Sequence, residues 1–144
     1  MTQNQVIKYL KQFYTLQLKL SQYLTAINKV NYSKEISLNN WDIDTEIIKF
    51  QTYYTNYCGM LITKEIKITE KSYFSLNSNF YEVVIEVENL KQLLKIILSN
   101  IITAQNFKNN LIQLIILYEK ASSLIFKHYG NSIKNSSKTV LKAS

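Results

Sequence analysis

The sequence of 144 residues suits a single domain, because a chain of this length buries roughly two thirds of its unfolded surface on folding. Its hydrophobic content of 47% excludes a disordered protein, and its net charge of +7 raises the question of a polyanionic partner. Cys58 is the only cysteine, which excludes an intramolecular disulfide bond and a zinc site with several cysteines.

The composition weakens the link between positive charge and nucleic acid. The sequence contains neither proline nor arginine, while isoleucine, lysine and asparagine are abundant. A+T-rich coding produces this bias, so lysine is also the default surface residue of such a chain. Because arginine is the usual reader of guanine edges and phosphate pairs, its absence disfavours sequence-specific recognition of duplex DNA.

Charge is distributed unevenly along the chain. Residues 41–90 carry eight acids and four lysines, whereas residues 1–40 sum to +4 and residues 91–144 to +7. The acidic middle has the patterns of strands and the basic flanks have those of helices. We therefore expect a sheet and a helical cover of opposite charge.

The first element is a long amphipathic helix over residues 4–30. Its apolar positions alternate in steps of four and three, interrupted only by Gln17: Val6, Leu10, Phe13, Leu20, Leu24 and Ile27. Further apolar side chains widen this face, which predicts that more than one neighbouring element covers it. A coiled-coil dimer with Gln17 as its polar register residue is the alternative to core packing.

The next segment is harder to assign. Residues 31–40 are polar and predict a connection, with room for a short strand at residues 35–38. Residues 41–57 fit neither the helical nor the strand period cleanly. Their abundant threonine and tyrosine favour the strand interpretation.

Two clearer alternating segments follow. Residues 61–69 place isoleucines on one face and polar residues on the other, and residues 80–88 alternate apolar residues with glutamates. This alternation is typical of half-buried antiparallel strands. The polar residues 75–79 between them predict a turn, so the two strands form a hairpin.

The C-terminal part predicts two helices. Asn89 is a candidate N-cap for a helix over residues 90–105, and polar residues 106–110 predict a break. A second helix over residues 110–129 begins apolar on all sides, which places it centrally, and Gly130 is a suitable stop.

These elements predict an α+β fold. A long N-terminal helix precedes a three- or four-stranded antiparallel sheet, and two C-terminal helices pack on one face of that sheet. Residues 1–130 form the single domain, and residues 131–144 form a mobile basic tail rich in serine, asparagine and lysine.

Few residues could support catalysis. His128 is the only histidine, so no histidine-based triad or multi-histidine metal site can form within one chain. Asp44, Glu65 and Lys67 have the order of a Mg²⁺-dependent nuclease site of the restriction-nuclease type. In a chain so rich in glutamate and lysine, a cross-strand ion pair is the far commoner meaning of this pattern.

Two candidate binding surfaces remain. Lysines spaced by four or seven residues would align on one face of a helical tail facing a polyanion: Lys127, Lys134, Lys138 and Lys142. Aromatic and apolar residues of the first helix and the sheet predict a protein-binding surface, and its candidate residues are Tyr9, Leu16, Tyr23, Tyr53, Tyr54 and Tyr57.

The sequence therefore favours a non-catalytic protein-interaction protein, an adaptor or a subunit of a larger assembly, which self-associates or binds another protein. The alternative is a nonspecific binder of single-stranded nucleic acid that uses the C-terminal lysines. A metal-dependent nuclease is a distant third. We expect no cofactor and no resident metal. No membrane-spanning segment and no signal peptide are predicted, so we expect a cytoplasmic protein.

Overall fold

The computed structural model describes residues 2–30, 32–62, 76–101 and 104–143. They form four helices: α1 (Gln3–Val30), α2 (Lys34–Cys58), α3 (Leu76–Asn100) and α4 (Gln105–Ala143). No strand occurs in these ranges, so the predicted α+β fold is wrong and the described part of the chain is all-helical. The predicted strand over residues 61–69 lies mainly outside the described residues.

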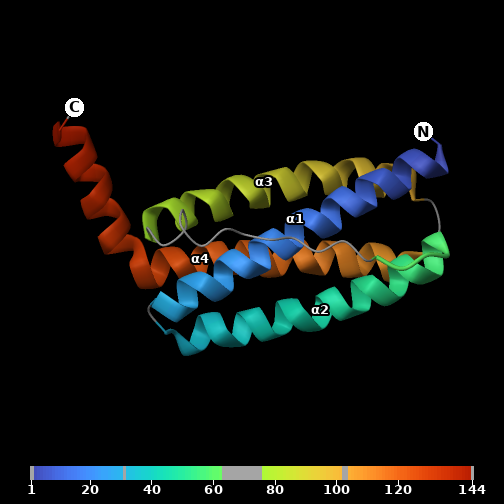
Figure 1. Ribbon diagram of the computed structural model, residues 1–144, viewed down its shortest axis with the longest axis horizontal. Helices are drawn as coiled ribbons and strands as arrows, with labels where there is room; N and C mark the ends of the chain where they lie inside the picture. Colours follow the sequence, from blue (N-terminus) through green and yellow to red (C-terminus); the bar gives the residue numbers. More distant parts are fainter. Residues whose placement is uncertain (1, 31, 63–75, 102–103, 144) are drawn as a thin grey trace.

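The four helices form an antiparallel bundle (Figure 1). α1 packs against α2 and α3, and α4 packs against the same two helices. α1 and α4 run in one direction while α2 and α3 run in the other, so every packed pair is antiparallel. α2 ends at one end of the bundle and α3 begins at the opposite end, which makes this a bundle with one long crossover connection.

The predicted helix over residues 4–30 is present as α1, and its wide apolar face is covered by two helices as expected. Gln17 lies in the bundle core with the apolar residues of the same stripe and is completely buried. Core packing within the chain therefore accounts for the stripe, without the coiled-coil dimer that was its alternative.

A connection and strands were predicted over residues 31–57, but residues 34–57 belong to helix α2. Its buried residues recur in steps of three and four: Ile36, Asn39, Ile43, Ile47, Phe50 and Tyr54. Asn39 holds one of these core positions, and a polar residue there conceals the helical period. Once Asn39 is counted as buried, the period is regular from residue 36 to residue 54.

Residues 80–88 were predicted as a strand and lie within α3. Val83 and Val87 are buried whereas Val84 and Ile85 are exposed, and Leu90 continues the buried stripe in the helical period. The apparent alternation over residues 80–88 was therefore a short coincidence within a longer pattern of period 3.6. The predicted turn over residues 75–79 is also wrong for its last four residues, which begin α3.

The predicted helices near the C-terminus have the wrong boundaries. Asn89 lies in the middle of α3 and caps nothing, and residues 106–110 belong to the first turns of α4. α4 passes Gly130 and continues to Ala143, so glycine did not end the helix. Its last turns project beyond the bundle (Figure 1).

The core is formed by all four helices, and each helix packs against two others. The predicted central position of α4 is wrong, because Ile112 and Ile116 of its apolar run are exposed. Buried residues of α4 extend from Phe107 to Tyr129. Aromatic rings fill the space between helices: Phe50 of α2 lies 5.6 Å from Tyr14 of α1 and 5.5 Å from Phe107 of α4, measured between ring centroids. Such contacts add to the stability that burial provides.

Candidate functional site

The six residues predicted to bind a partner belong largely to the core. Tyr23 and Tyr54 are buried. The other four are partly buried and pack against the core: Tyr9, Leu16, Tyr53 and Tyr57. Tyr53 and Tyr57 both lie against Phe107 of α4, with ring centroids 6.0 and 5.8 Å apart. These tyrosines join helices of one chain and offer little surface to a partner.

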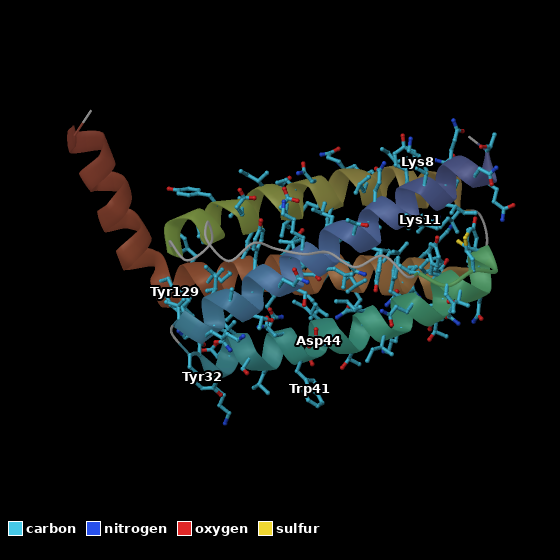
Figure 2. All side chains as sticks on the ribbon, viewed as in Figure 1. Lys8, Lys11, Tyr32, Trp41, Asp44 and Tyr129 are labelled. Carbon is cyan, nitrogen blue, oxygen red and sulfur yellow. The ribbon has the colours of Figure 1, made fainter. Side chains whose placement is uncertain are left out.

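The outer face of α2 presents large apolar side chains to solvent. Leu38, Trp41 and Ile48 are 58%, 72% and 64% exposed. Spacings of three and seven place them on one side of the helix, and Thr45 lies between them on the same side. We call these four residues the α2 face. Figure 2 shows Trp41 projecting from α2 away from the bundle.

An open hollow of about 520 Å³ adjoins the α2 face. It lies between the end of α1 and the start of α2, and Trp41 lines it together with the exposed Tyr32. Asp44 also lines the hollow and accepts a long hydrogen bond of 3.5 Å from the hydroxyl of Ser21. Burial raises the pKa of Asp44 above its usual value.

The C-terminal lysines are not equivalent. Lys127 binds Glu35 of α2, with its Nζ 3.1 Å from one carboxylate oxygen and 3.3 Å from the other. His128 lies 3.4 Å from the same carboxylate, and these partners lower the pKa of Glu35, chiefly through the hydrogen bond from Lys127. Residues 134, 138 and 142 lie on the projecting part of α4 (Figure 1).

The structure brings no catalytic set together among the described residues. Asp44 lies on α2, whereas Glu65 and Lys67 lie outside the described ranges. Those ranges hold no group of three histidine, cysteine, aspartate or glutamate side chains that could bind a metal ion. Cys58 is partly buried at the end of α2, where desolvation raises the pKa of its thiol and so disfavours the nucleophilic thiolate.

Sequence reasoning missed the α2 face because residues 41–57 were interpreted as a strand. The signal was present: Leu38, Trp41 and Ile48 share a helical face opposite the buried stripe of α2. An amphipathic helix with a second apolar stripe on its polar side is a pattern that only a helical assignment makes visible.

Comparison with known proteins adds no family to these observations. The chain matches no family model, and neither a curated protein nor a solved structure is significantly similar to it. Within the described ranges, none of the helices has both the length and the apolar character needed to cross a membrane.

Proposed function

We propose that this chain is a non-catalytic protein-interaction protein that binds a protein partner, or a second copy of itself, through the α2 face. The observation that supports the proposal is the solvent exposure of Trp41, Leu38 and Ile48 on one side of one helix. Tryptophan dominates the energetics of many protein interfaces because its large ring buries much surface at low entropic cost. Apolar side chains spaced by three and seven residues are the anchors that a helix places in a partner's groove.

The adjoining hollow supports the same proposal. Tyr32 lines the hollow beside Trp41, so a partner would meet two exposed aromatic side chains together with a concave surface. Such an adaptor or assembly subunit needs neither a cofactor nor a metal. A cytoplasmic location is part of the proposal.

The test replaces the apolar anchors while keeping the helix. In Trp41→Gln/Ile48→Gln, both changes lie at exposed positions, so we expect the bundle to fold normally. Sedimentation equilibrium of the purified protein measures self-association, and quantitative comparison of proteins retained by the wild type and by the variant measures binding to other proteins. We expect the variant to lose the dimer or a defined retained partner.

The matched control is Ile85→Gln/Ile116→Gln, which changes two exposed apolar residues on α3 and α4. We expect this control to associate as the wild type does. A wild-type protein that is monomeric and retains the same proteins as Trp41→Gln/Ile48→Gln would contradict the proposal.

A second candidate function, binding of single-stranded nucleic acid, is supported by the length of α4. Because α4 is helical to Ala143, Lys134, Lys138 and Lys142 repeat every four residues along a helix that extends past the bundle. Lys127 is a weaker member of the set because it is paired with Glu35. Nearby aromatic residues would supply stacking.

Fluorescence anisotropy of a short single-stranded oligonucleotide tests this candidate. If three lysines neutralise phosphates, the logarithm of the affinity should fall with the logarithm of the salt concentration with a slope of about −2. Replacing Lys134, Lys138 and Lys142 by glutamine should abolish this binding. The control replaces Lys34, Lys95 and Lys108 by glutamine. If this control and the Lys134, Lys138 and Lys142 variant bound the oligonucleotide with equal affinity, the nucleic-acid candidate would be refuted.

A further inference from the structure

A second hollow lies on another side of the bundle, between α1 and α3. Its volume is about 690 Å³, within the range of roughly 300–1,000 Å³ that is typical of small-molecule sites. Leu61 and Ile62, which follow α2, contribute to its wall, so three parts of the chain surround it. We call it the α1/α3 groove. None of the described residues that line it also lines the hollow beside the α2 face.

The described side chains that line the α1/α3 groove carry a net positive charge. Lys8, Lys11 and Lys19 line it from α1, and Glu86 of α3 is its only acidic lining residue among the described side chains. Glu86 lies 3.9 Å from the Nζ of Lys19, so that pair is approximately neutral. Neither Lys8 nor Lys11 has an ion pair within the described part of the chain.

The two unpaired lysines lie at one end of the groove. Lys8 and Lys11 are both exposed and lie one helical turn apart on the part of α1 that runs alongside α3 (Figure 2). At this spacing their ammonium groups can approach one anionic group together. Placing two positive charges side by side costs free energy in the empty protein, and an anion would offset that cost.

The remaining wall of the α1/α3 groove is mainly apolar. Leu16 of α1, Leu93 of α3 and Ile62 are partly buried and pack against the core, so each presents the rest of its surface to the groove. A phosphate or another small hydrated anion would leave this wall uncovered. A neutral hydrocarbon would leave the lysines without a partner.

We propose that the α1/α3 groove binds a small amphipathic anion, a carboxylate joined to an aliphatic body. The carboxylate lies between the ammonium groups of Lys8 and Lys11, and the aliphatic body covers Leu16, Leu93 and Ile62. Charge-assisted hydrogen bonds fix the head group, and burial of apolar surface supplies the remaining affinity. The site is independent of the α2 face, so the protein could bind its ligand and a protein partner simultaneously.

Isothermal titration calorimetry of the full chain with decanoate, kept below its micelle-forming concentration, tests the proposal. We expect one decanoate per chain. Decanol and decylammonium, which share the aliphatic body but lack the negative charge, should bind at least about tenfold more weakly, because each loses a charge-assisted hydrogen bond.

Variants identify the site. Lys8→Gln/Lys11→Gln should weaken decanoate binding by at least about tenfold, whereas Lys34→Gln/Lys95→Gln, which removes two exposed lysines outside the groove, should leave it unchanged. The absence of decanoate binding would overturn the proposal, as would equal affinity in the two double variants or equal affinity for decanoate and decanol. Trp41→Gln/Ile48→Gln should bind decanoate normally, so failure of one proposal is distinguishable from failure of the other.

Discussion

At the scale of single residues, the buried polar side chains differ in how well they are satisfied. Asn39 of α2 donates to the backbone carbonyl of Leu117 in α4 at 3.4 Å, and Asn110 of α4 donates to the backbone carbonyl of Glu46 in α2 at 3.0 Å. Each of the two helices α2 and α4 therefore donates one asparagine hydrogen bond to the backbone of the other. Gln17 is different, because neither atom of its buried amide has a partner within the described part of the chain.

Gln17→Leu should therefore stabilise the protein. The change removes a buried amide whose desolvation is uncompensated and places an apolar side chain of similar size in an apolar stripe, so we expect the free energy of unfolding to rise by about 1–3 kcal/mol. Urea denaturation measures this change. Asn39→Leu is the control, and it should destabilise because it removes the hydrogen bond that joins α2 to the Leu117 carbonyl of α4. A loss of stability in Gln17→Leu would show that the amide has a partner of its own.

At the scale of elements, α2 has a clear signal at each end. The hydroxyl of Ser33 accepts a hydrogen bond of 3.3 Å from the backbone N–H of Ile36, which caps the N-terminus. Gly59 adopts a left-handed conformation with φ of 70° and donates its N–H to the carbonyl of Thr55 at 2.8 Å. These two caps define the ends of α2, although the hydrophobic pattern between them did not predict a helix.

Gly59→Ala should lower the free energy of unfolding by about 1 kcal/mol, because the left-handed conformation strains a residue that has a Cβ. Outside the backbone around Gly59 itself, no atom of the described residues lies within 4 Å of the position that this Cβ would occupy, so the expected cost comes from the backbone conformation. Thermal or urea denaturation provides the measurement. Gly59→Asn should cost less, since asparagine tolerates this conformation better. Equal stability of the wild type and Gly59→Ala would contradict the assigned cap.

At the scale of the whole molecule, ion pairs connect three of the packed helix pairs. Lys19 and Glu86 join α1 to α3, Lys91 and Glu119 join α3 to α4 at 3.0 Å, and Lys127 and Glu35 join α4 to α2. Of these pairs, only Lys19–Glu86 joins the acidic middle of the chain to a basic flank, because Glu35 and Glu119 belong to the flanks themselves. The expected attraction between an acidic sheet and a basic helical cover is therefore wrong for the described part of the chain. Such exposed pairs contribute more to orientation than to stability.

The pair between α2 and α4 should make stability depend on pH in the acidic range. The folded-state pKa of Glu35 lies below its usual value of 4.5, so its contribution to stability is fully present above pH 4.5 and is lost as the pH falls through the lowered pKa. Glu35→Gln should therefore lose less stability than the wild type on acidification. Melting temperatures measured between pH 3 and pH 7 provide the test.

Lys127→Gln serves as the control for this prediction. Lys127 is the main cause of the lowered pKa of Glu35. Lys127→Gln should therefore lose less stability on acidification than the wild type does, as Glu35→Gln should. If the melting temperatures of the wild type and both variants fell by the same amount between pH 7 and pH 3, the pair would not contribute to the pH dependence of stability.

Much of α1 could be predicted from the sequence because its apolar period is sustained from Val6 to Ile27. The α2 face could not be predicted while residues 41–57 were interpreted as a strand. The α1/α3 groove could not be predicted at all, because Lys8 and Leu93 are distant in sequence and only helix packing brings them to one hollow.

The sequence by itself determined where apolar and charged side chains are available, whereas the caps of α2 at Ser33 and Gly59 were recognised only in the structure. Only the tertiary structure decided that residues 80–88 are helical. A run that alternates over nine residues is compatible with both periods, and burial of Val83, Val87 and Leu90 in one bundle core selects the helix. The physical reason is that the local sequence pattern indicates which side chains prefer burial. Contacts between distant segments determine which of these side chains are buried together.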